Sequence, residues 1–150
     1  MKHAKRITIA ALIGGLMLSG SAYARLIGLS SGFPGTIYDI NPSTGAATAL
    51  TVTQNTSLVG ATFLKGVLYG SDICGANCFS LDSLDLYTGA NTFVSNQDGS
   101  ANLHGLASDE DAGLMYAIDQ DGGNILKSIT AGGVVTSIGT GTGIDGRGMA

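Results

Sequence analysis

A short motif centred on glycine occurs three times in the chain, and its regular spacing restricts the fold more than any other feature. The central glycines are Gly60, Gly105 and Gly148, which lie 45 and 43 residues apart. The three motifs occupy residues 58–62, 103–107 and 146–150. A repeat of about 44 residues indicates supersecondary units that stack on one another and bury a shared core.

Other elements recur with the same period. A strand-like segment with a central tyrosine and a final aspartate follows the first two motifs, at residues 67–72 and 114–119, and turn glycines stand at Gly45, Gly89 and residues 132–133. The elements are short and partly alternating, contain β-branched or aromatic residues, and are bounded by Gly, Asp, Asn or Ser. These features predict strands joined in hairpins. Glycine suits the turns because it adopts positive φ without a Cβ clash.

Four short strands in each repeat predict an all-β fold, a partial β-propeller built from four-stranded antiparallel blades of about 44 residues. Residues 57–95 and 102–139 make two blades, residues 25–53 supply three strands of a partial blade, and residues 146–150 start a further one. A closed propeller takes about four to eight blades. We therefore expect an N-terminal fragment of a longer protein, or several chains that assemble into a ring. A β-sandwich with chance self-similarity is the alternative fold.

The order of motif, strand and turn resembles the blades of secreted bacterial β-propeller repeat proteins of uncharacterised function. The pattern is Gly-Leu-Ala, then Leu-Tyr-x-h-Asp, then Thr-Gly-x-x-Thr, where h is apolar. This resemblance covers nearly all of residues 25–150, and it implies a fold rather than an activity. The Asp-x-x-Thr-Gly turn at residues 85–89 is also similar to that of quinoprotein blades. Those blades dock through a tryptophan, however, and this chain has none.

The first 24 residues have the features of a removable signal peptide that forms a short helix. Basic residues precede an apolar stretch at residues 7–18, and Ala-Tyr-Ala ends at the expected cleavage residue, Ala24. The apolar stretch would span about 18 Å as a helix, too short for a bilayer core of about 30 Å. An uncleaved membrane anchor is the alternative. We expect export to the periplasm, the extracellular space or the cell surface, with no membrane span in residues 25–150.

Two small motifs are candidates for special chemistry. Cys74 and Cys78 are expected in a loop, where an oxidising compartment would favour a local disulfide between them. Asp119 and Asp121 resemble the start of a calcium loop, but Gly123 replaces the third oxygen ligand and no glutamate stands at the twelfth position. They are calcium candidates, with a solvated hairpin turn as the other interpretation.

Four further residues are of interest for the fold. Ser30 lies in a Gly-x-Ser-x-Gly string, but a strand rather than a helix is expected after it, which predicts a loop and not a catalytic nucleophile. His104, the only histidine after residue 24, is expected to pack or to face the propeller axis. Tyr69 and Tyr116 occupy matching places in successive repeats and are expected in the core. No catalytic or cofactor-binding residue is predicted.

The net charge of the chain limits the classes of partner that we expect it to bind. Cleavage after Ala24 leaves four basic residues against 11 acidic ones, a net charge of −7, which disfavours nucleic acid and anionic membranes. We expect an exported binding or interaction module that holds an unidentified ligand or protein at the propeller loops. One alternative is a periplasmic propeller enzyme, a lyase or hydrolase whose active-site residues lie in other blades. Another is a lectin-like ring assembled from short chains.

Overall fold

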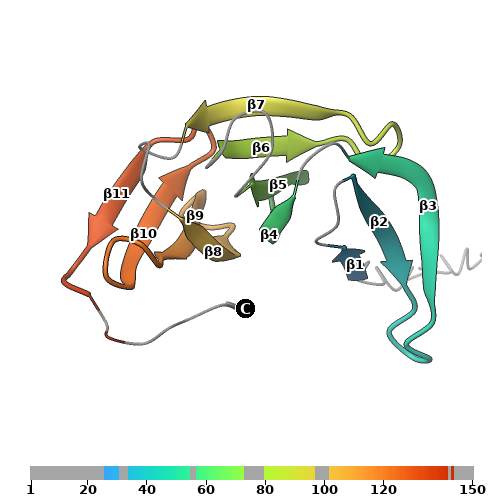
Figure 1. Cartoon of the computed structure of the whole chain (residues 1–150), viewed down its shortest axis with the longest axis horizontal. Helices are drawn as coiled ribbons and strands as arrows, with labels where there is room; N and C mark the ends of the chain where they lie inside the picture. The colour runs from blue at the N-terminus through green and yellow to red at the C-terminus, as the bar shows by residue number, and fades with distance from the viewer. Residues whose placement is uncertain are drawn as a thin grey trace, which may run out of the picture.

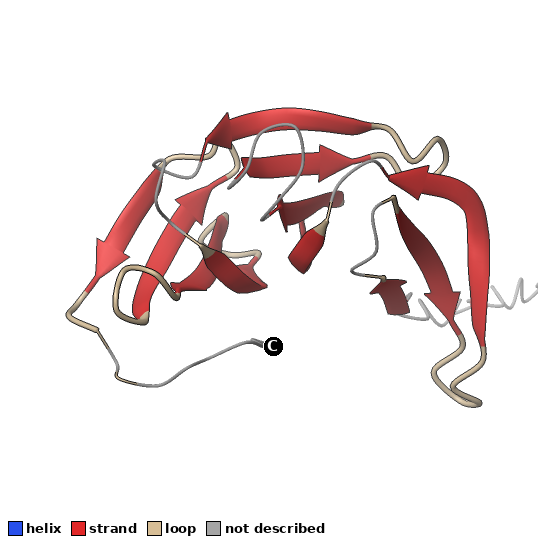
Figure 2. Cartoon of the chain, viewed as in Figure 1, coloured by secondary structure: helices blue, strands red, loops and turns tan. Residues whose placement is uncertain are grey.

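The computed structural model describes residues 26–30, 34–54, 57–72, 80–96, 102–141 and 143. Every regular element in these residues is a β-strand (Figure 2). The strands form three antiparallel sheets, so the prediction of an all-β fold is confirmed. The signal segment 1–24, the two cysteines Cys74 and Cys78, and the third glycine motif at residues 146–150 lie outside the described residues.

Each sheet is a meander in which neighbouring strands are consecutive in the sequence. The first sheet contains β1 (Leu26–Leu29), β2 (Gly35–Ile40) and β3 (Ala47–Gln54). The second contains β4 (Leu58–Leu64), β5 (Val67–Asp72), β6 (Ser80–Leu84) and β7 (Asn91–Asn96). The third contains β8 (Leu103–Asp109), β9 (Leu114–Asp119), β10 (Ile125–Thr130) and β11 (Val135–Ile138). The short strands predicted from the repeat are therefore present.

The three sheets lie next to one another in an open arc (Figure 1). The first strands of the sheets, β1, β4 and β8, lie on the concave side, and the last strands, β3, β7 and β11, lie on the outside. The second sheet stands in the middle and has a hydrophobic cluster on each of its faces.

The hairpin between β2 and β3 has the same hydrogen bonds as the hairpin between β6 and β7. Asn41 Oδ1 accepts hydrogen bonds from the backbone N–H groups two and three residues further on, at 2.9 and 3.3 Å. Asp85 Oδ1 accepts from the same two groups of its own turn, at 2.7 and 3.0 Å. Gly45 and Gly89 end the two turns with φ of 70° and 68°, a conformation that favours glycine. The sequence repeat is thus also a repeat of backbone structure.

The second and third sheets share the larger core. Side chains alternate between the two faces of a strand, and the face of the second sheet with Leu64, Tyr69 and Leu81 packs against the face of the third sheet with Met115 and Ile129. These five side chains are at most 8% exposed. Because burial of apolar surface is the dominant favourable force in folding, this contact holds the two sheets together.

The inner strands β4 and β8 approach each other most closely at the glycine of the repeated motif. A Cβ atom at Gly60 would lie 2.8 Å from the backbone nitrogen of Leu106 and 2.9 Å from that of Gly105. Gly105 itself has a φ of 60° and lies where the pairing of β8 with β9 shifts register. The motif therefore has glycine at its centre for two physical reasons, a close backbone approach and a positive φ.

A smaller core lies on the opposite face of the second sheet. It consists of Leu58, Leu68 and Leu84, with Leu29 of β1 packed against it. This contact joins the first sheet to the second.

The two repeated tyrosines have different surroundings. Tyr69 is buried in the larger core, which confirms its prediction. Tyr116 is only half-buried, because by alternation it lies on the face of the third sheet opposite Met115, and that face has no neighbouring sheet in the described part of the chain.

Candidate functional site

A groove lies between β1 and the inner strand β4. It consists of two adjoining cavities of about 260 and 240 Å³. Both are lined by Ile27 and Leu29 of β1 and by Ala61 of β4; Leu58 and Gly60 line the larger cavity, and Phe63 and Leu68 the smaller. Apart from Thr62 the lining side chains are apolar, and none of the lining residues is charged.

The groove adjoins an open sheet edge. β1 is hydrogen-bonded to β2 alone, so its other edge has no neighbouring strand in the described residues. Such an edge presents a row of backbone donors and acceptors to which an extended chain can bind. In the second and third sheets the corresponding position is filled by β4 and β8. The groove therefore lies where the repeat places the first strand of a four-stranded sheet.

Two carboxylates are buried on the second sheet, close to this groove. Asp72 is 2% exposed and Asp82 is 3% exposed. Both carboxylates lie on the same face of the sheet as Leu68 and Leu84, because side chains two residues apart along a strand point to the same face. In the sequence Asp72 stood out only as the final aspartate of a repeated segment and Asp82 did not stand out, because a single aspartate in a strand gives no sign of burial.

The buried carboxylates are held by specific hydrogen bonds. The backbone N–H of Ser57 donates to Asp72 Oδ1 at 3.2 Å, and Asn91 Nδ2 donates to Asp82 Oδ2 at 3.3 Å. Burial raises the pKa of Asp82, an effect that the hydrogen bond from Asn91 opposes and the nearby charge of Asp72 reinforces. A carboxyl with a raised pKa is a feature of acid–base sites and also of buried structural groups. For Asp82, the hydrogen bond from Asn91 explains how the carboxyl is held within the sheet.

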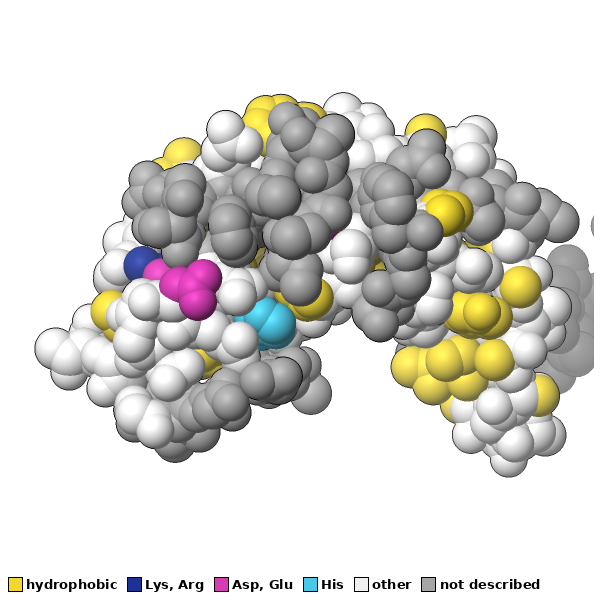
Figure 3. All heavy atoms as spheres, viewed as in Figure 1, with side chains coloured by type: hydrophobic (Ala, Val, Ile, Leu, Met, Phe, Trp, Pro, Cys, Tyr) yellow, Lys and Arg dark blue, Asp and Glu magenta, His cyan; other side chains and the backbone are white. Residues whose placement is uncertain are grey.

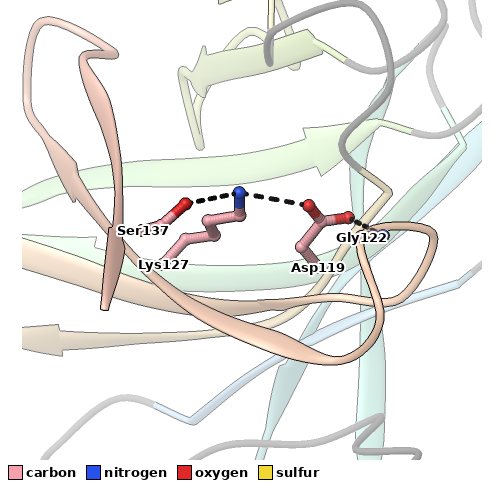
Figure 4. A network of polar contacts seen from close by, with 4 residues as sticks. All are labelled: Asp119, Gly122, Lys127 and Ser137. Carbon is pink, nitrogen blue, oxygen red and sulfur yellow. Dashed lines mark hydrogen bonds and ion pairs between the residues drawn. The ribbon is translucent and has the colours of Figure 1, made fainter. Parts of the chain in front are cut away.

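Asp119, one of the two calcium candidates, takes part in a network of polar contacts in the third sheet (Figure 4). Asp119 Oδ2 lies 3.3 Å from Lys127 Nζ, and Asp119 Oδ1 accepts a hydrogen bond from the N–H of Gly122 at 3.0 Å. Lys127 Nζ also contacts Ser137 Oγ at 3.0 Å. Asp119 is therefore a buried ion-pair partner that ties β9 to β10, whereas Asp121 is exposed in the turn that follows.

The described ranges contain no group of three or more His, Cys, Asp or Glu side chains that could hold a metal ion. Ser30 follows β1, and its Oγ accepts a hydrogen bond from the N–H of Thr36 at 2.8 Å, which agrees with the predicted loop. His104 is half-buried on β8, in register with Ile118 of β9.

Polar contacts that the sequence did not predict also join the second and third sheets. The carboxylate of Glu110, in the turn after β8, accepts hydrogen bonds from the N–H of Lys65 at 3.0 and 2.9 Å. Lys65 lies in the turn after β4, so the contact links the same turn of successive repeats. Asp109 Oδ1 meanwhile accepts from the N–H of Ala112 at 2.9 Å within the turn. An acidic loop tip alone does not reveal such a link.

Comparison with known proteins gives no family for the chain: no family model matches it, and no curated protein matches it. The described residues also include no helix long and apolar enough to cross a bilayer.

Proposed function

We propose that the chain forms part of an exported β-propeller that acts as a binding or interaction module. The observation that carries this proposal is that the second sheet has a hydrophobic core on each face. In a two-layer sandwich each sheet buries one face against its partner and exposes the other. In a radial array every sheet lies between two neighbours, which agrees better with the environment of the second sheet.

The position of the strands supports the same proposal. β1, β4 and β8 lie on the concave side of the arc (Figure 1), as the innermost strands of propeller blades do around a central channel. The close approach of β4 and β8 at Gly60 and the repeated turns at Asn41 and Asp85 favour true structural repeats over chance similarity.

The proposed role is binding at the loops around the concave side. Loops held by a rigid scaffold are the usual place for recognition, and the contact between Lys65 and Glu110 fixes two of them relative to each other. The described carboxylates that are most buried take part in structural hydrogen bonds or an ion pair. With a net charge of −7 after cleavage, the favoured ligands are neutral or cationic: a glycan, a small molecule or a basic protein surface.

The proposal is tested with the purified chain from residue 25 to residue 150. It is applied to glycan and protein arrays and, in parallel, assayed for polysaccharide lyase and hydrolase activity. Saturable binding without turnover is the expected result. Turnover would instead support the propeller enzyme, and the absence of both binding and turnover would contradict a binding role for this part of the protein.

A further inference from the structure

The third sheet pairs a buried aspartate with a lysine on the neighbouring strand. Asp119 ends β9, and its Oδ2 lies 3.3 Å from Lys127 Nζ on β10 (Figure 4). Lys127 is two positions along from the residue opposite Asp119, so both side chains lie on one face of the sheet. The ammonium favours the ionised form of the carboxyl, so Asp119 can be buried with its charge.

The second sheet has the same arrangement of strands but a different charge at one position. Asp72 is the counterpart of Asp119, since each ends the strand that follows a glycine motif. Asp82 is two positions along from the residue opposite Asp72, which is the place of Lys127 relative to Asp119. Where the third sheet has a lysine, the second sheet therefore has another carboxylate.

Both carboxylates of the second sheet are buried where this sheet meets the first. They share the face of the smaller core, on which Leu29 of β1 packs. The side chain of Leu58 lies over the backbone beside them, because a Cβ atom at Gly70, the residue opposite Asp82, would lie 2.7 Å from Leu58 Cδ1. Movement of the first sheet away from this face would expose the two carboxyl groups to water.

The other ionisable group at this contact is also acidic. Asp39 of β2 is opposite Ile27 and so lies on the same face of the first sheet as Leu29. In the view of Figure 3, hydrophobic side chains gather over the first sheet. On the described strands of the second sheet, the side chains that share the face of the two carboxylates are uncharged: Leu58, Ala61, Phe63, Leu68, Ser80, Leu84, Asn91 and Phe93.

We propose that the contact between the first and second sheets is a pH-sensitive joint, tight while the Asp72–Asp82 pair holds a proton and looser once both carboxylates are ionised. Burial and the charge of Asp72 raise the pKa of Asp82 more than its hydrogen bonds with Asn91 and Ser80 lower it. In the opened joint water reaches the pair, and Asp82 regains an ordinary pKa. This inference does not depend on whether the three sheets belong to a propeller.

The direction of the effect follows from proton linkage. Opening releases a proton wherever the pH lies between the ordinary and the raised pKa of Asp82, so the opening equilibrium rises with pH in that range. One proton changes it by at most about tenfold per pH unit, and the rise levels off above the raised pKa. The groove between β1 and β4 lies at the same contact, so it opens together with the joint.

The test is amide hydrogen exchange of the purified chain by mass spectrometry at about pH 4 and about pH 7, values that bracket the titration of a buried carboxyl. Each rate is divided by the intrinsic rate at that pH. A small sheet depends on packing for its stability, so protection of β1 and β2 should fall several-fold at the higher pH. Protection of β9 and β10, which carry the Asp119–Lys127 pair, should change much less. An unchanged first sheet, or an equal loss in both sheets, would overturn the proposal.

Substitutions assign the effect to the carboxylate pair. Asp82→Asn cannot ionise and should keep the first sheet protected at both pH values. Asp82→Lys reproduces the charges of the third sheet and should also remove the pH dependence. Asp111→Asn is the matched control, because Asp111 is exposed in the turn after β8, and it should behave like the wild type. A pH dependence that survives Asp82→Asn, or one that is abolished by Asp111→Asn or Asp39→Asn instead, would contradict the assignment.

Discussion

Replacement of Gly60 by alanine tests the contact between the inner strands. The added Cβ would lie 2.8 and 2.9 Å from two backbone nitrogens of β8 and 3.1 Å from Ser71 Oγ. Distances below 3.0 Å to backbone cannot be relieved by a side-chain rotation, so β4 and β8 must move apart. The larger core, which includes Leu64 and Leu103, lies between the second and third sheets, to which β4 and β8 belong. Its packing would be loosened.

The expected magnitude follows from these contacts. Overpacking of a closely packed contact costs about 1–3 kcal/mol, whereas Gly→Ala at an unstrained, open site stabilises by about 0.4–1 kcal/mol through the unfolded chain. Gly132→Ala is the matched control, because Gly132 lies in an exposed turn and its added Cβ would meet only Thr130 Oγ1, at 3.9 Å. The two variants carry the same chemical change and should shift stability in opposite directions.

The assay is urea unfolding of both variants and of the wild-type chain from residue 25 to residue 150, at one protein concentration. Gly60→Ala is expected to lower the free energy of unfolding, and Gly132→Ala to leave it unchanged or raise it. If Gly60→Ala proved as stable as Gly132→Ala, the close backbone approach of the inner strands would be refuted.

Three other substitutions probe the charged groups by the same unfolding assay. Lys127→Met should cost about 3–5 kcal/mol, since it leaves the buried carboxylate of Asp119 without its ion-pair partner; the exposed change Lys65→Met should stay within about 0.5 kcal/mol of wild type. Burial raises the pKa of Asp82, so its contribution to stability is full at pH below the ordinary carboxyl pKa and is lost as pH rises through the raised value. Asp82→Asn should therefore be more stable than wild type at neutral pH, with a difference that shrinks on acidification; an equal difference at all pH values would contradict this. Hydrogen bonds from the turn N–H groups lower the pKa of Asp85, so its contribution is present above the ordinary carboxyl pKa and is lost as pH falls, and Asp85→Asn should abolish that loss while keeping the turn.

The strands and turns could be predicted from the sequence because their signals are local. The positive φ of Gly45 and Gly89 and the side-chain caps at Asn41 and Asp85 depend on residues within four positions of one another. The glycine at the centre of the motif was also visible as a repeat. The reason for that glycine is the close approach of Gly60 to the backbone of another sheet. This approach involves residues about 45 positions away, so only the structure could reveal it.

The polar contacts could not be predicted either, because they also depend on how separate strands and sheets come together. Asp119 was interpreted as a possible oxygen ligand because the residues after it resemble a calcium loop, and nothing in the sequence indicated its ion pair with Lys127, which lies on the next strand two positions along from the residue opposite Asp119. Glu110 was not expected to contact another repeat, whereas its carboxylate accepts hydrogen bonds from the N–H of Lys65 in the preceding repeat. Both contacts arise from strand register and sheet packing, which a single sequence specifies only indirectly.

The central claim, that the sheets are blades around a common axis, is tested most directly by a crystal structure of the purified chain from residue 25 to residue 150. The account predicts that β1, β4 and β8 lie around one axis, with the second sheet covered on both faces. A stack in which the sheets pack face to face as parallel layers, with no shared axis, would contradict it.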